Sequence, residues 1–106
     1  MDKETVLVIL ANYRVALEQY GVHAERVVLF GSFSHGTARQ GSDIDVVIVS
    51  KDFERMDFWQ RIDALAEAIC DVREPIEAIG MTPDEWESGD SLITDFAKQG
   101  ELVYAA

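Results

Sequence analysis

The stretch GSFSHGTARQGSDID, residues 31–45, separates two apolar runs in a chain of 106 residues. VVLF (27–30) precedes it and VVIV (46–49) follows it. Short apolar runs bounded by glycine-rich segments are typical of buried strands, so we expect two strands joined by this loop. Asp43 and Asp45 open the second strand, where residues i and i+2 point to the same side of a sheet. The sequence therefore predicts two neighbouring carboxylates at the end of a glycine-rich loop.

Hydrophobic periodicity and turn residues predict the remaining elements. Helices are expected over residues 2–20, 32–38, 56–71 and 91–99, and strands over 26–30, 43–50, 75–80 and, at the sheet edge, 101–105. Thr82 and Glu85 have the spacing of a capping box, and Pro83 suits the first position of one more short helix. This order predicts a small α/β (α+β) domain with a mixed, twisted sheet and helices packed on one face.

Composition favours one domain in the cytoplasm. The chain is 48% hydrophobic and 27% charged, and no apolar stretch reaches the roughly 20 residues that span a bilayer. We expect no signal peptide, because the segment MDKETVLVIL has no cationic start and no cleavage site. Cys70, the only cysteine, can form no intrachain disulfide, which fits a reducing compartment. Its place in the helical pattern predicts a small core residue.

The negative charge lies almost entirely in the second part of the chain. Residues 1–42 hold four acidic and four basic residues, whereas residues 43–106 hold sixteen and five, for a net charge of −11. Such a surface argues against binding a long nucleic acid through its phosphates. It suits a basic protein partner, or simply solubility.

The glycine-rich loop fits one of three phosphate-binding patterns. Gly31 and Gly36 have P-loop spacing, but Thr37 and Ala38 stand where that motif needs Lys and Ser or Thr. The G-x-G-x-x-G fingerprint of dinucleotide-binding proteins does not occur. The third pattern is Gly-Ser, ten residues, then Asp-x-Asp, the signature of DNA polymerase β-like nucleotidyltransferases, and the loop matches it at every position.

The two aspartates predict a magnesium site. Like charges so close together repel unless a cation lies between them or one is protonated. Mg²⁺ is commonly held by one or two carboxylates together with substrate phosphates, and phosphoryl transfer with two metals needs a third carboxylate. Glu77 is the candidate, because a carboxylate within a short apolar strand requires compensation. Glu74 and Asp71 are rivals in the more polar connection before that strand.

The chain thus resembles the minimal nucleotidyltransferases, antitoxin-like partners of HEPN-domain proteins within the DNA polymerase β-like superfamily. The resemblance rests on the segments VVLFGSFSHG, SDIDVVIV, PIEAIGMTPDEW and GELVYA, and it covers nearly the whole length. It implies a polymerase β-like core, two Mg²⁺ (or Mn²⁺) ions, and transfer of AMP from ATP to a hydroxyl. In some relatives this hydroxyl belongs to a tyrosine of a HEPN toxin.

The resemblance also implies roles for individual residues. Gly31 and Ser32 would hold the triphosphate, while Asp43, Asp45 and Glu77 would be catalytic residues and metal ligands. Many relatives carry Arg or Lys before the second glycine, where this chain has His35, and Asp where it has Glu77. His35 remains a candidate phosphate contact, and so does Arg39, for which a solvated loop position is the alternative.

Three functions remain open from the sequence. The first is an active nucleotidyltransferase that modifies a protein, and the second is an antitoxin that neutralises a basic partner by contact alone. The third is a transferase for a small molecule, which the lack of a substrate-binding second domain disfavours. Trp59 and Trp86 could stack on a base, but at helical spacing they are expected to pack in the core or at a partner interface.

Overall fold

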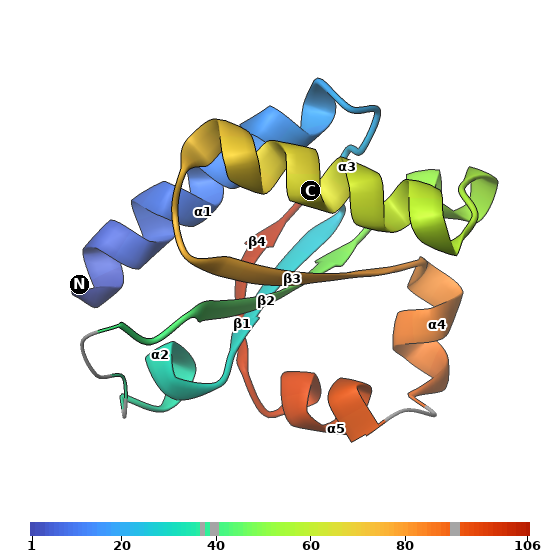
Figure 1. Cartoon of the computed structure of the whole chain (residues 1–106). Coiled ribbons are helices and arrows are strands. Elements are labelled where there is room, and N and C mark those ends of the chain that lie inside the picture. Colours follow the sequence, from blue (N-terminus) through green and yellow to red (C-terminus); the bar gives the residue numbers. More distant parts are fainter. Residues whose placement is uncertain (37, 39–40, 90–91) are drawn as a thin grey trace.

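A computed structural model of the protein describes residues 1–36, 38, 41–89 and 92–106 (Figure 1). The helices are α1 (Lys3–Glu18), α2 (Ser32–His35), η1 (a 3₁₀ turn, Lys51–Arg55), α3 (Phe58–Val72), α4 (Pro83–Ser88) and α5 (Leu92–Lys98). The strands are β1 (Arg26–Phe30), β2 (Ile44–Val49), β3 (Ile76–Met81) and β4 (Glu101–Ala105).

The four strands form one mixed sheet in the order β3-β2-β1-β4. β1 runs antiparallel to both β2 and β4, whereas β2 and β3 run parallel. A parallel pair needs a crossover between its strands, and η1 and α3 supply it. The mixed sheet and the adjacency of the two strands around the glycine-rich loop confirm the prediction from sequence.

The larger core lies between the sheet and the two long helices. Val27, Leu29, Ile44, Val46 and Ile48 point from the strands toward α1 and α3 and are buried there. The two helices also contact each other, and the hydroxyl of buried Tyr13 donates a hydrogen bond of 3.0 Å to the carbonyl of Leu65. Figure 1 shows α1 and α3 side by side over this face.

The opposite face of the sheet carries a second, smaller core. Val28, Val47 and Val49 pack there with Trp86 of α4 and Ala97 of α5. The prediction that helices cover one face only is therefore wrong. The physical reason is that β1 and β2 are apolar on both sides, so each face must be shielded from water.

Local signals placed most element ends within about two residues, the usual scatter of such boundaries. The capping box at α4 is present, since Thr82 and Glu85 each accept a hydrogen bond from the other's backbone N–H. The turn η1 was not predicted. Cys70 is exposed, which corrects its assignment to the core. In the described part of the chain, no helix is both long and apolar enough to cross a membrane.

Candidate active site

The sheet register brings the predicted carboxylates together. Asp45 on β2 lies directly between Phe30 on β1 and Glu77 on β3. Asp45 and Glu77 are partners in a parallel ladder, so their side chains leave the same face of the sheet side by side. Glu77 is far from Asp45 in the sequence, and only the crossover through α3 makes them neighbours.

Gly31 fits against Asp45 in a way that only glycine allows. Its φ of 74° lies in the left-handed region, and a Cβ built on it would clash with Oδ2 of Asp45. The Gly31 carbonyl accepts hydrogen bonds of 3.2 Å from the N–H groups of Ser34 and His35. The loop backbone is thereby folded tightly against the carboxylate.

The three carboxyl groups interact electrostatically. Partial burial, a hydrogen bond with the carboxyl group of Glu77, and the charges of Glu77 and Asp43 raise the pKa of Asp45 to about 6. A hydrogen bond between two carboxyl groups requires a proton on one of them. The shared proton relieves the repulsion between the two carboxyl groups, as a bound cation would also do.

The donor set fits a hard divalent cation held jointly with a substrate. Among the described residues, no three acidic, histidine or cysteine side chains are already clustered tightly enough to hold a metal ion. Asp43 and Glu77 are exposed, whereas Asp45 is partly buried. Mg²⁺ is typically bound by one or two carboxylates, water and substrate phosphates, so an open set of this kind suits it better than a closed protein cage would.

A cavity of about 430 Å³ adjoins the carboxylate pair. Asp45 and Glu77 line it together with the side chains of Phe30, Ile69, Ile76, Ala78 and Ile79. The sequence did not predict Ile69 as part of the site. It lies on α3, and its place in the helical pattern indicates burial but not the cavity it borders.

The remaining predicted residues have different outcomes. Ser32 follows Gly31 directly as the first residue of α2, so it stands beside the carboxylate site, and it is partly exposed. His35 ends α2 and is exposed. Arg39 lies outside the described residues, so its proposed phosphate contact stays a prediction from sequence.

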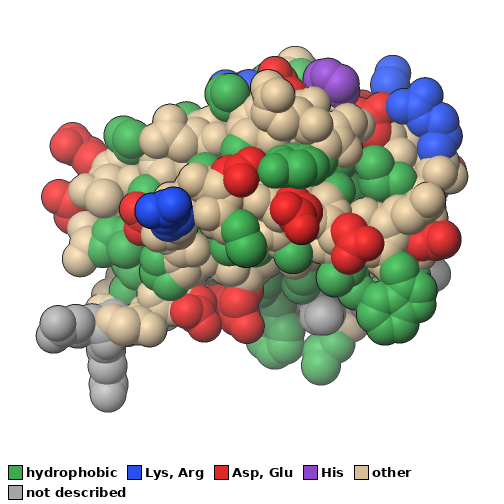
Figure 2. All heavy atoms as spheres, turned by 45° about the horizontal axis from the view of Figure 1, so that its top comes forward, with side chains coloured by type: hydrophobic (Ala, Val, Ile, Leu, Met, Phe, Trp, Pro, Cys, Tyr) green, Lys and Arg blue, Asp and Glu red, His purple; other side chains and the backbone are tan. Residues whose placement is uncertain are grey.

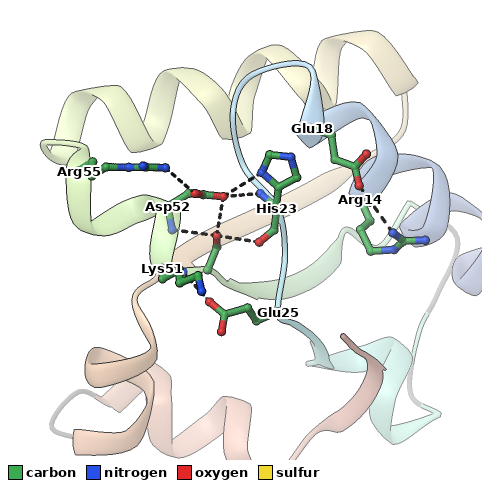
Figure 3. A network of polar contacts seen from close by, with 8 residues as sticks. Arg14, Glu18, His23, Glu25, Lys51, Asp52 and Arg55 are labelled. Carbon is green, nitrogen blue, oxygen red and sulfur yellow. Dashed lines mark hydrogen bonds and ion pairs between the residues drawn. The ribbon is translucent and has the colours of Figure 1, made fainter.

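Another aspartate, in the turn η1 that follows β2, has very different surroundings (Figure 3). Asp52 accepts hydrogen bonds from the backbone N–H of His23 at 2.8 Å and from Arg55 at 2.7 Å. Burial alone would raise the pKa of Asp52, but hydrogen bonds and charge from His23, with a further bond from Ser50, hold it below the usual value. A surface depression of about 510 Å³ adjoins it, away from the carboxylate pair.

The nucleotidyltransferase domain model matches residues 11–102, which is most of the chain and includes all three carboxylates. The chain belongs to the nucleotidyltransferase domain family. The polymerase β-like fold expected from the sequence is thereby confirmed. Proteins of this family generally use a nucleoside triphosphate and divalent metals. No curated protein matches the sequence.

Two solved structures show the same fold as this nucleotidyltransferase domain. One is a Sulfolobus solfataricus protein assigned as a nucleotidyltransferase, with a TM-score of 0.61 and 23% identity over 93% of this chain and 82% of that one. The other is a toxin–antitoxin structure with AMP-PNP, with a TM-score of 0.62 and 17% identity over 87% of this chain and 69% of that one. At such low identity the likeness concerns the fold alone.

Proposed function

We propose that this nucleotidyltransferase domain transfers a nucleoside monophosphate, AMP from ATP, to a hydroxyl group of a protein partner. The observation that carries the proposal is the convergence of Asp45, Glu77 and Gly31. The two strand residues are ladder partners, and the glycine turn lies against one of their carboxylates.

The turn is suited to the triphosphate. Backbone N–H groups of a tight glycine turn can point toward an anion, and the Ser32 hydroxyl adds a further donor. His35 on the same short helix is a candidate for an outer phosphate contact. A bulkier residue than glycine at position 31 would separate the turn from Asp45, and thus the phosphates from the carboxylates.

The carboxylates are suited to two divalent metals. Asp43, Asp45 and Glu77 would hold Mg²⁺ or Mn²⁺ together with the phosphates of the nucleotide. When bound, these ions supply charge neutralisation at the reacting phosphoryl group and polarise the attacking oxygen. The raised pKa of Asp45 supports this role, because it reflects partial burial together with neighbouring acidic charge that the protein alone leaves uncompensated.

The transfer would proceed with one bond formed and one broken. The acceptor hydroxyl oxygen bonds to the α-phosphorus, and the bond between that phosphorus and the oxygen leading to the β-phosphate breaks. Pyrophosphate leaves with that oxygen and its electron pair. The hydroxyl proton passes to a carboxylate of the site and then to water.

A toxin–antitoxin structure with AMP-PNP is among the structures that share this fold, which supports a protein acceptor. We propose a HEPN-type toxin or another basic protein. The alternative is an antitoxin that acts by contact without catalysis. The strongly acidic second part of the chain supports this contact mechanism as much as it supports docking of a protein substrate.

The decisive experiment measures transfer and neutralisation together. The protein is incubated with each of the four nucleoside triphosphates, Mg²⁺ and the product of the neighbouring gene as acceptor. Mass spectrometry should show the mass of one or more AMP units added to the acceptor, with stoichiometric pyrophosphate. Asp45→Asn and Glu77→Gln should fold normally and transfer at least ~10³-fold more slowly, the equivalent of about 4 kcal/mol.

Glu54→Gln is the matched control, because Glu54 is an exposed acid on η1 away from the site. This variant should transfer at the parent rate. If the parent transfers no nucleotide while all these variants still neutralise the acceptor, the contact mechanism replaces the catalytic one.

A further inference from the structure

One face of α3 carries an exposed apolar row. Trp59, Ile62 and Ala66 follow each other at steps of three and four residues, so they lie on one side of the helix. Trp59 is 70% exposed and Ile62 39%, and Ala66 is exposed as well. Phe58 beside them is 66% exposed. A large apolar row in water on an otherwise acidic protein marks an interaction surface.

The row has an aromatic anchor at its N-terminal end. The rings of Phe58 and Trp59 meet edge to face with centroids 5.2 Å apart. Exposed aromatic side chains that hold one another in place are typical hot spots of protein interfaces, because they offer a large area at little entropic cost. The other tryptophan, Trp86, is only 8% exposed and belongs to the second core.

The row leads to the candidate active site. Ile69 comes three residues after Ala66, on the same side of α3, and it lines the cavity that holds Asp45 and Glu77. From Trp59 to Ile69 the helix rises about 15 Å. The two carboxylates leave the opposite face of the sheet from α3, because the residues that alternate with them in β2 and β3 belong to the larger core under that helix. A partner that packs along the row would therefore reach the α3 side of the cavity, next to the edge strand β3.

A row of carboxylates runs beside the apolar row. Asp63, Glu67 and Asp71 follow at steps of four residues and are exposed. Asp71 accepts a hydrogen bond of 2.6 Å from the Tyr20 hydroxyl, whereas Asp63 and Glu67 form no ion pair with any described residue. Figure 2 shows acidic and hydrophobic side chains interspersed on this side of the molecule.

This charge pattern selects the occupant. A second copy of the chain would bring the same acidic row and a net charge of −11 to the contact, so self-association through α3 is opposed by repulsion. An anionic membrane surface is opposed for the same reason. A partner segment with an apolar side flanked by Lys or Arg is complementary on both counts.

We propose that α3 is the docking surface for the protein acceptor, and that it binds a basic, amphipathic helix of that protein. The apolar side of this helix packs on Trp59, Ile62 and Ala66, and its basic residues pair with Asp63 and Glu67. Beyond the row, the acceptor passes the edge strand β3, so that its hydroxyl enters the cavity next to Asp45. This inference rests on the proposed function, since it assigns the place where the acceptor binds.

The test uses a synthetic helical peptide with leucine on one side and lysine on both flanks. Titration into the full chain should shift Trp59 fluorescence to shorter wavelength, with buried Trp86 as a constant background. A nitroxide label on Cys70, which is exposed on the same helix, should lose mobility. Raising the salt concentration from 0.05 to 0.5 M should weaken binding at least ~10-fold. A peptide with glutamate in place of lysine should not bind.

Variants of α3 test which residues contact the peptide, and calorimetry measures the peptide affinity of each variant. Trp59→Ala, and the double variant Asp63→Asn with Glu67→Gln, should each weaken binding at least ~10-fold. Phe96→Ala is the matched control, because Phe96 on α5 is 57% exposed and lies off α3, and it should bind as the parent does. With the natural acceptor, Trp59→Ala should raise KM for the acceptor and leave that for ATP unchanged.

Three results would overturn the proposal. The first is that Trp59→Ala and Phe96→Ala bind the basic peptide with equal affinity. The second is that the protein forms concentration-dependent dimers that Trp59→Ala abolishes. The third is that the protein binds phosphatidylserine vesicles more strongly than the basic peptide. Asp45→Asn separates docking from chemistry, since it should bind the peptide as the parent does. If that variant docks normally and the parent transfers nothing, the proposed function fails while the docking surface stands.

Discussion

Asp45, near the start of β2, and Asp52, in the turn η1 that follows this strand, illustrate two uses of a carboxylate. Asp52 accepts hydrogen bonds from His23 and Arg55, and its pKa is lowered. Asp45 faces two further acids, and its pKa is raised to about 6. The first carboxylate stabilises the fold by itself. The second destabilises the fold as long as no proton or cation compensates it, a pattern that is common at functional sites.

The sharpest way to test this contrast is to supply the missing positive charge. ATP with Mg²⁺ at about 100 times its dissociation constant should stabilise the parent by ~2.7 kcal/mol, whereas Mg²⁺ alone should have little effect. Asp43→Asn should abolish the gain, and Asp52→Asn should keep it despite a lower starting stability. Thermal unfolding measures both. If Asp43→Asn responds to ATP·Mg²⁺ as the parent does, the carboxylates do not bind the metal.

Gly31→Ala adds a methyl group where the glycine turn contacts Asp45. The positive φ alone should cost about 1 kcal/mol, and a Cβ at this position also displaces the Asp45 carboxylate. Gly36→Ala is the matched control, since Gly36 has a φ of 71° but no atom within 4 Å of an added Cβ. Gly31→Ala should lose more stability than Gly36→Ala in urea titrations, because only Gly31 combines the positive φ with a close neighbour and a ψ of −153°. Only Gly31→Ala should lose the response to ATP·Mg²⁺. Equal nucleotide responses would show that the close approach is not needed.

Asp52→Asn should destabilise the fold by about 1–2 kcal/mol, because charge-assisted hydrogen bonds at η1 are weakened. A lowered pKa means that this carboxylate contributes stability above the usual pKa, and that the contribution is lost as the pH falls through the folded value. The difference between parent and variant should therefore shrink on acidification below pH ~4. Urea titrations at pH 7 and pH 3 check this. A variant as stable as the parent at pH 7 would contradict it.

Asp45→Asn should stabilise the metal-free fold, whereas Asp52→Asn destabilises it. Its effect on stability should be the smallest of those predicted here. Because the pKa of Asp45 is raised to about 6, ionisation destabilises the metal-free fold as the pH rises from 4 through 6. In the presence of EDTA the variant should be more stable than the parent by about 1 kcal/mol at pH 7.5, with solvent screening taken into account, and should show no gain at pH 4. A variant that is less stable at both values would mean that Asp45 is a structural carboxylate after all.

The sequence predicted the local elements of this candidate site better than its surroundings. The glycine turn, the strand after it and the capping box at Thr82 depend on residues close together in the chain, so local patterns identify them. The Asp45–Glu77 ladder depends on the register of a parallel pair, which no local pattern fixes.

Faces and exposure were predicted less well for the same reason. Cys70 has apolar neighbours at helical spacing, but its side chain faces water instead of the core. The second core under α4 and α5 was missed, because strands that are apolar on both sides do not indicate what covers them. The turn η1 owes its shape to contacts of Ser50 and Asp52 with the distant His23.

The split of the carboxylates between a hairpin and a crossover has a consequence for biosynthesis. Asp45 meets the glycine turn through the antiparallel β1–β2 pair, which a growing chain can close early. Glu77 joins them only after α3, fifteen residues long, has folded back over the sheet and β3 has aligned with β2. A nascent chain that has emerged from the ribosome only as far as α3 therefore has two of the three acids and no complete centre.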